Sequence, residues 1–280
     1  MKRTAVVVLV IVCAMSAWAQ AVPKSGFFTT SDGVRIHYLE VGAGPAIVFI
    51  PGWTMPAWIW EKQIAYFAPK YHVIAVDPRS QGESDKPAEG NYPERRARDY
   101  KELVDHLHLA RPVLVGWSMG VAELLAYAGQ FGTADVQGIV LVDGFVVLDE
   151  ALQKFFPQWM HTVAADRKAF ASSFIPSMFK KPQSESYKQR VIAESLKTPT
   201  NTAVELGILG RPDSTAFPKL AQTAVLFVAS KQLAKQVDTL RAAVPNLQSE
   251  MFEDAGHALF VDEPERFNTA VEKFITAAAK

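Results

Sequence analysis

The sequence predicts an α/β protein whose mostly parallel central sheet is covered by helices on both faces. Short apolar runs that suit buried strands alternate along the chain with longer segments of helical periodicity. Between residues 145 and 218 this alternation is interrupted by a helical stretch without a clear strand pattern. We therefore expect an α/β core formed by residues 26–144 and 219–280. A helical cap at 145–218 would be inserted after the strand that ends near Asp143, over the sheet edge where such proteins place their sites.

Length and composition suit one domain of this kind. The chain has 280 residues, of which 49% are hydrophobic, enough for a large core. Its formal net charge is zero and it has no polybasic patch, which argues against nucleic acid or anionic lipid as a partner. No His, Cys, Asp or Glu cluster has metal-ligand spacing, and no G-x-G-x-x-G fingerprint is present. We therefore expect no metal and no cofactor.

The first 19 residues read as a secretory signal peptide. Residues 1–3 bring two positive charges, residues 4–18 are almost wholly apolar, and Ala17-Trp18-Ala19 is an A-x-A cleavage signal. A second possible cleavage site ends at Ala21. The apolar run is shorter than the roughly 20 residues that a membrane span needs, so no stable membrane anchor is expected. The expected location is the periplasm or the exterior of the cell.

The mature chain should begin at Gln20 or Val22 and should be found outside the cytoplasm, because export removes a segment of this pattern. Mass spectrometry of the protein recovered from the cell exterior or the periplasm measures the new N-terminus. An intact Met1 on protein in a membrane fraction would show instead that the apolar run is an anchor.

The core begins with a predicted hairpin, because the turn residues Ser31-Asp32-Gly33 separate strand patterns at 27–30 and 34–41. The run 46–50 is wholly apolar, which suits a strand buried on both faces. A helix at 92–108 is indicated by apolar residues at helical spacing. The other elements expected in this part are a helix around 56–68, a strand at 72–76 and a polar loop at 77–87.

The same alternation continues through the rest of the chain. A β-branched apolar run at 111–115 predicts a strand, and a segment with helical periodicity follows at 121–130. The next strand is expected at 136–142, directly before Asp143. After the cap, the expected elements are a strand at 223–229, a helix at 233–244, a strand at 247–252 and a helix at 264–279.

The segment Gly116-Trp117-Ser118-Met119-Gly120 joins a predicted strand to a predicted helix. A G-x-S-x-G turn in this context is so tight that its serine takes a strained backbone conformation, and only small residues two positions away avoid a clash. The hydroxyl is held out at the carboxyl end of the sheet, and the helix N-terminus behind it favours developing negative charge. The segment is typical of a nucleophile elbow and makes Ser118 the candidate nucleophile.

On these residues the chain resembles the α/β-hydrolase superfamily, specifically its cofactor-free, lid-bearing serine esterases, perhydrolases and lactonases. The resemblance covers nearly the whole chain from about residue 26. The matching segments occur in the family's order at residues 49–53, 77–84, 115–120, 255–258 and 262–267. Within the second of these, we interpret Asp77, Arg79 and Ser84 as structural.

The resemblance implies a role for several residues. Ser118 would attack a carbonyl, and His257, in the loop before the last helix, would take its proton. The backbone N–H groups of Trp53 and Met119 would form the oxyanion hole. Most relatives have histidine where this chain has Pro51, which leaves the backbone donor intact and leaves open how that loop is braced.

The acid of the triad is the main departure from the family. Relatives usually carry it just after the strand seen here at 223–229, but residues 229–235 contain no carboxylate. Some relatives place it at the end of the strand after the elbow helix, where this chain has Asp143. We therefore predict that Asp143 hydrogen-bonds His257. The alternatives are Asp238, on a helix face expected to meet solvent; Asp254, close to His257 in sequence; or a dyad without an acid.

The cap is rich in aromatic residues, which points to an apolar pocket for an acyl or aryl group. Trp117 should pack beneath the site. The candidate substrate-binding residues are Trp117, Phe145, Phe156, Trp159 and Phe174.

Together these features predict an exported serine hydrolase that cleaves a carboxylic ester or lactone through an acyl-enzyme. A serine at the elbow argues against haloalkane and epoxide chemistry, which in this fold needs a carboxylate nucleophile. One alternative is a perhydrolase-like activity. Another is a catalytically silent homologue that binds a ligand. The partner is a small molecule in each case, and the oligomeric state is left open.

Overall fold

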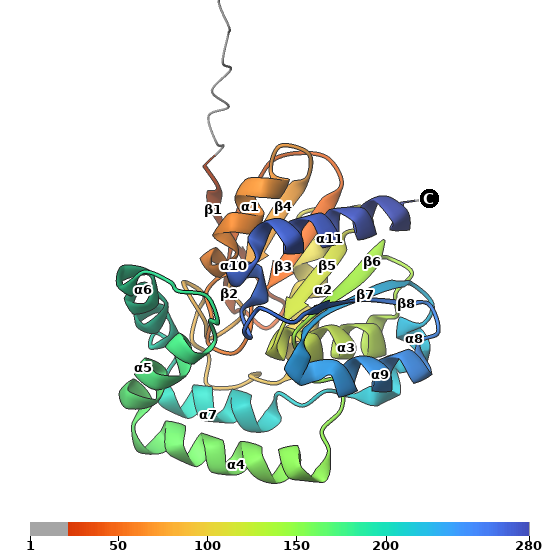
Figure 1. Ribbon diagram of the computed structural model, residues 1–280. Helices are drawn as coiled ribbons and strands as arrows, with labels where there is room; N and C mark the ends of the chain where they lie inside the picture. Colours follow the sequence, from red (N-terminus) through yellow and green to blue (C-terminus); the bar gives the residue numbers. More distant parts are fainter. Residues whose placement is uncertain (1–21, 280) are drawn as a thin grey trace, which may run out of the picture.

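The computed structural model describes residues 22–279 (Figure 1). The predicted signal peptide lies outside this range. An eight-stranded sheet forms the centre, in the order β1-β2-β4-β3-β5-β6-β7-β8. The β1–β2 and β2–β4 pairs are antiparallel and the other pairs are parallel, so the predicted mostly parallel sheet is confirmed. The strands are β1 (Lys24–Thr29), β2 (Arg35–Val41), β3 (Ala46–Ile50), β4 (His72–Val76), β5 (Val113–Trp117), β6 (Gly138–Val142), β7 (Ala224–Ser230) and β8 (Leu247–Phe252).

Helices cover both faces of the sheet, as predicted. One face packs against α2 (Pro93–His106), α3 (Met119–Phe131), α8 (Phe217–Leu220) and α9 (Ala234–Ala243). The other packs against α1 (Glu61–Phe67), α10 (Leu259–Asp262) and α11 (Pro264–Ala278). The strand β3 shows why its sequence is wholly apolar: Val48 and Ile50 enter the first core, whereas Ile47 and Phe49 enter the second. Both faces of this strand are therefore buried.

The cap consists of α4 (Glu150–Ala165), α5 (Arg167–Ser177), α6 (Glu185–Ser195) and α7 (Thr200–Leu209). In Figure 1 these helices lie together at one end of the sheet, beside the carboxyl ends of the parallel strands. The helix α4 contacts α7 and α5, and α5 contacts α6. Residues 214–220 behave differently, because Ala216 and Phe217 pack with α3 in the core of the sheet.

Element boundaries differ from the prediction at two places that matter for the site. The strand expected at 111–115 starts later, at Val113, because Arg111 has a left-handed φ of 45° and Pro112 has no N–H to donate. It also continues to Trp117, which brings Ser118 to the end of the strand. The short helix α10, directly after the His257 loop, was not predicted. Among residues 22–279, no helix combines the length and the apolar character that crossing a membrane requires.

Candidate active site

Ser118 sits between β5 and α3 with φ of 56° and ψ of −115°, the strained backbone expected of this turn. The flanking glycines leave the space that the turn needs. A Cβ on Gly116 would lie 2.6 Å from the carbonyl oxygen of Gly120, and one on Gly120 would lie 3.2 Å from that of Ile50 in β3. These contacts are with backbone atoms, which cannot move aside as a side-chain tip can. The tight turn therefore excludes a side chain at Gly116, and the end of β3 leaves little room for one at Gly120.

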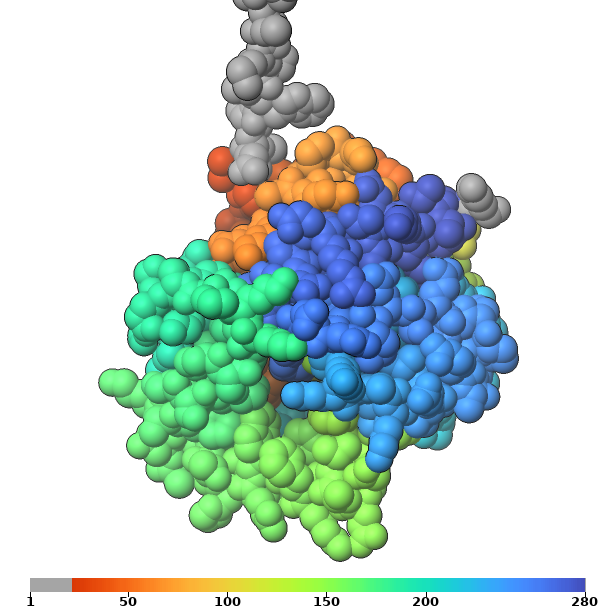
Figure 2. All heavy atoms as spheres, viewed as in Figure 1, coloured from red at the N-terminus to blue at the C-terminus, as the bar shows by residue number. Residues whose placement is uncertain are grey.

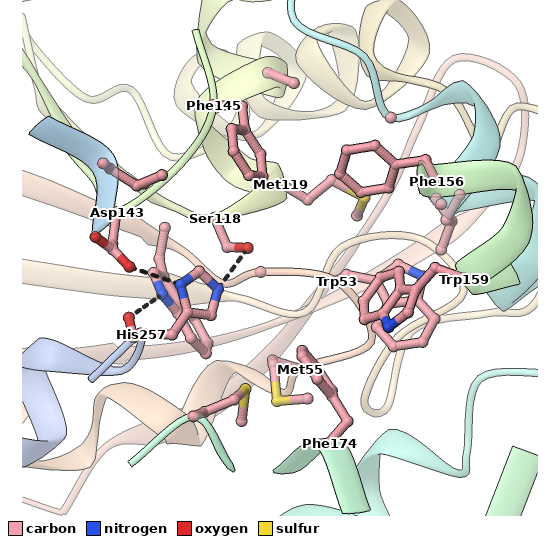
Figure 3. Close-up of a pocket in the computed structure, with 18 of the residues that line it drawn as sticks. Trp53, Met55, Ser118, Met119, Asp143, Phe145, Phe156, Trp159, Phe174 and His257 are labelled. Atoms are coloured by element: carbon pink, nitrogen blue, oxygen red, sulfur yellow. Dashed lines mark hydrogen bonds and ion pairs between the residues drawn. The ribbon is translucent and has the colours of Figure 1, made fainter. Parts of the chain in front are cut away.

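His257 lies between Ser118 and Asp143 (Figure 3). Its Nδ1 is 2.7 Å from Oδ2 of Asp143, and its Nε2 is 2.9 Å from Oγ of Ser118. Because a carboxylate can only accept, Nδ1 carries the hydrogen and Nε2 is left as the acceptor for the serine proton. The three side chains are thus connected in the order and the tautomer that a general-base relay requires.

Asp143 reaches the imidazole from the end of β6. Its backbone has a left-handed φ of 42°, and its side chain is almost fully buried. The backbone N–H of Asp143 donates to the carbonyl oxygen of Val228, in the neighbouring strand β7, at 2.9 Å. Its Oδ1 accepts the N–H of Ser230 at 2.6 Å. The carboxylate therefore lies across the end of β7, the strand after which relatives usually carry their acid.

The two other candidate acids are elsewhere. Asp238 is exposed on α9 and pairs with Arg241 at 3.2 Å. Asp254 is exposed and lies 3.5 Å from Lys180. Neither forms a hydrogen bond to His257 in the part of the chain that the structure describes, so the geometry favours Asp143.

The His257 loop is fixed by Asp262, a residue that the sequence analysis did not single out. Its carboxylate accepts the N–H groups of Gly256 and Lys180, each at 2.8 Å, and so ties the loop to the cap. The indole Nε1–H of Trp117, at the end of β5, donates to the carbonyl oxygen of His257 at 2.9 Å and holds the same loop. The only sequence signal for Asp262 is its place at the start of the family-like segment 262–267.

The two predicted oxyanion donors flank Ser118. A Cβ on Gly52, the residue before Trp53, would lie 2.9 Å from the Cβ of Ser118, so this loop approaches the nucleophile closely. Met119 follows Ser118 as the first residue of α3. Within residues 22–279, neither the Trp53 nor the Met119 backbone N–H has a hydrogen-bond acceptor. Both amides are therefore free to bind an oxyanion.

Gln81 braces the loop of residues 52–55 in this chain, which has proline at position 51 where most relatives have histidine. Its side chain is fully buried, and its Nε2 donates to the carbonyl oxygens of Gly52 at 3.1 Å and Met55 at 2.8 Å. Its Oε1 accepts the N–H of Thr54 at 3.1 Å. One amide side chain thus holds both ends of the oxyanion loop. Gln81 was not predicted as a site residue, because it lies in a loop interpreted only as structural.

The contacts of Asp77, Arg79 and Ser84 fit that structural interpretation. Arg79 forms a buried, bidentate pair with Asp99, with a Nε–Oδ2 distance of 2.6 Å. The Ser84 hydroxyl donates to the carbonyl oxygen of Asp77 at 2.5 Å. The carboxylate of Asp77 accepts Nδ1 of His37 at 2.7 Å.

This last pair belongs to a second Ser–His–Asp array, since Nε2 of His37 lies 2.8 Å from Oγ of Ser25. Its distances match those at Ser118, but its setting does not. Ser25 is the second residue of the edge strand β1, with no helix N-terminus directly behind it, and does not line the cavity described next. The array therefore lacks features that a nucleophile needs besides a base.

Ser118 and His257 open into a cavity of about 400 Å³ between the cap and the sheet. All five predicted substrate-binding residues line it, and Trp117 also packs beneath the site with its ring almost fully buried. Figure 2 shows the surface hollowed between the cap, in green, and the C-terminal part of the core, in blue. The other large apolar side chains of the lining are Trp53, Met55, Met119, Leu148, Phe155, Met178, Leu206 and Leu233.

The cavity contains few polar groups. Asp143 and His257 are the only acidic or basic side chains among its lining residues, and Ser177 and Gln232 add neutral polar groups. No group of three or more His, Cys, Asp or Glu side chains that could hold a metal ion occurs within the described range 22–279. A neutral, largely apolar small molecule suits such a lining.

Comparison with known proteins agrees with the fold. The model of the alpha/beta hydrolase family matches residues 47–270, so the chain belongs to this family of hydrolases. The AB hydrolase superfamily protein YisY of Bacillus subtilis (strain 168) is 24% identical over 274 residues, which cover 89% of this chain and 98% of that protein.

Two further similarities cover different shares of the chain. A non-heme haloperoxidase of Rhodococcus erythropolis is 35% identical over 117 residues, which span less than half of either protein, 41% of this chain and 43% of the relative. The structure of an esterase from Exiguobacterium antarcticum has a TM-score of 0.83 at 22% identity, covering 90% of this chain and 100% of that one. This second similarity shows the shared fold.

Replacing Asp143 by asparagine should lower kcat by up to about 10⁴-fold. The asparagine carbonyl oxygen would accept the Ser230 N–H, as Oδ1 does now, and its amide N–H₂ would then face His257. Nδ1 would become the acceptor and Nε2 would carry the hydrogen, so the imidazole could not accept the serine proton. Steady-state hydrolysis of a p-nitrophenyl ester measures the effect.

Asp238→Asn is the matched control. Asp238 was one of the alternative acids, but it is exposed and pairs with Arg241, so its replacement should leave kcat unchanged. A folded Asp143→Asn enzyme with the kcat of the wild type would exclude Asp143 as the acid.

Proposed function

We propose that this protein is a serine hydrolase that cleaves a carboxylic ester or lactone with an apolar acyl or aryl part. The observation that carries the proposal is the connected array of Ser118, His257 and Asp143 at the floor of an apolar cavity, beside two free backbone amides. Each component supplies one element of acyl transfer: a nucleophile, a base in the correct tautomer, and donors for the oxyanion.

In the first half-reaction, the Ser118 oxygen attacks the substrate carbonyl while Nε2 of His257 accepts its proton. The carbonyl oxygen becomes an oxyanion, which the Trp53 and Met119 amides bind. Asp143 stabilises the imidazolium, since its carboxylate is buried against Nδ1. His257 then protonates the leaving alkoxide, the ester C–O bond breaks, and the acyl group remains on Ser118.

In the second half-reaction, His257 removes a proton from water, and the hydroxide oxygen attacks the acyl carbonyl. The bond to Ser118 breaks, the serine oxygen regains its proton from His257, and a carboxylic acid is released. For a lactone, acid and alcohol are one molecule. Export to the periplasm or the exterior is part of this proposal, and its support is the pattern of residues 1–19.

A perhydrolase-like activity is the second candidate, and the similarity to a non-heme haloperoxidase favours it. Hydrogen peroxide would replace water as the attacking group on the acyl-enzyme, and the product would be a peracid. The catalytically silent alternative rested on the absence of an acid at the usual position. The hydrogen bond between Asp143 and His257 speaks against it.

A fluorophosphonate probe should label Ser118, and Ser118→Ala should abolish both labelling and ester hydrolysis while the fold is retained. Ser25→Ala is the matched control, because Ser25 has equivalent distances to a histidine and an aspartate but lies on an edge strand. Labelling and turnover should be unchanged in this variant. Intact-mass and peptide mass spectrometry, with a p-nitrophenyl ester assay, measure both. A folded Ser118→Ala protein with wild-type turnover would refute the proposal.

The cap should control which acyl chain length is preferred. Phe156 lines the cavity and packs edge-on against Phe145, so Phe156→Ala should enlarge the acyl pocket and favour longer chains. We expect the ratio of kcat/KM for octanoate and acetate esters to rise by about 10–200-fold. Phe179→Ala is the control, since Phe179 is a cap aromatic that does not line the cavity. An unchanged ratio in Phe156→Ala would show that this part of the cap does not determine specificity.

A further inference from the structure

The loop that carries the oxyanion donor Trp53 is held from the cap as well as from the core. The Trp53 indole is buried among cap residues, and its Nε1 donates to the carbonyl oxygen of Ala203 on α7 at 2.8 Å. The Arg167 guanidinium of α5 lies over the indole, 4.7 Å from the ring centroid. Two cap helices therefore fix this side chain. The Trp53 backbone amide is the proposed oxyanion donor.

Thr54, the next residue, is strained and fully buried. Its φ is 59°, a left-handed conformation that is unfavourable for a β-branched residue and persists only where the surroundings enforce it. Its N–H is held by Gln81, on the core side. On the cap side, its hydroxyl lies 2.7 Å from that of Ser195, the last residue of α6. Thr54 is thus clamped between core and cap.

Arg167 completes the clamp. Its guanidinium donates to Oγ of Ser195 at 2.8 Å and to the Ser195 carbonyl oxygen at 3.1 Å. It is buried, and no ion pair to a carboxylate is formed within residues 22–279. Burial lowers the pKa of the guanidinium to about 10. A buried cation without a counter-ion is costly, so packing alone gives no reason for an arginine here.

From these contacts we infer that Arg167 and Ser195 of the cap are positioning residues for the oxyanion hole. Arg167 orients the Ser195 hydroxyl, that hydroxyl holds Thr54 in its left-handed conformation, and Thr54 fixes the direction of the Trp53 N–H. The cap would then support the chemical step in addition to lining the acyl pocket. This inference rests on the proposed function, in which that N–H binds the oxyanion.

A positioning role and a merely structural role predict different kinetics. An oxyanion donor binds the transition state more strongly than the ground state, so displacing it lowers kcat and leaves KM nearly unchanged. A change that only reshapes the acyl pocket alters KM and the preference among acyl chains. A general loss of packing lowers the unfolding temperature without a selective effect on kcat.

The test removes single hydroxyl groups from the clamp. Ser195→Ala and Thr54→Val should each lower kcat by about 10–100-fold, less than the loss expected for a donor removed outright. KM should change by less than about threefold, and the octanoate-to-acetate ratio should stay constant. Thr54→Ser keeps the hydroxyl and should restore most of the activity. The rate of fluorophosphonate labelling should fall in parallel with kcat.

Thr198→Val is the matched control. Thr198 is buried three residues after Ser195, and its hydroxyl has no hydrogen-bond partner in the described structure. Its removal should leave kcat and the labelling rate unchanged.

The outcomes separate the two proposals. Normal kcat in folded Ser195→Ala and Thr54→Val, or an effect confined to KM and chain-length preference, would overturn the positioning role while the probe still labels Ser118. If the wild-type protein is not labelled at all, the proposed function fails and this inference fails with it. Should Ser195→Ala not fold, the comparison of Thr54→Val with Thr54→Ser decides.

Discussion

The site depends on the two hydrogen bonds that the Asp143 carboxylate accepts. One oxygen accepts a hydrogen bond from the Ser230 backbone N–H, and the other accepts one from the Nδ1–H of His257. The carboxylate thus links the imidazole directly to the end of β7. The left-handed backbone at Asp143 turns the side chain toward this position, and its own N–H is paired to Val228. Because both oxygens are occupied and buried, neither the tautomer nor the orientation of His257 is left free.

The parts of the fold and site that sequence predicts best are those determined locally. The elbow at Ser118 follows from a strand, two glycines and a helix that are adjacent in the chain, and the buried strand β3 follows from five consecutive apolar residues. Asp143 could be proposed because a strand end is recognisable and the usual acid position is empty of carboxylates. Its contact with His257 depends on β6 lying beside β7, an order that the alternating pattern alone does not fix.

Residues that act across long sequence separations escaped the same reasoning. Gln81 reaches the loop after β3, Asp262 joins the His257 loop to residue 180, and Ser195 meets Thr54 over 141 positions. A glutamine, an aspartate or a serine in a polar segment carries no signal of its partner, since pairing is decided only when separate segments of the chain fold together. The second array at Ser25 has the same residue types at similar distances, but it lies on an edge strand without the tight turn and the following helix that surround Ser118.

The near absence of charge in the cavity has a consequence for product release. In the proposed reaction a neutral ester or lactone enters a lining whose only acidic or basic side chains are Asp143 and His257. The acid that forms ionises at neutral pH, and an apolar surrounding disfavours the anion. The buried Asp143 carboxylate adds electrostatic repulsion. Turnover thus converts a ligand that the cavity favours into one that it expels, so substrate should bind more tightly than product.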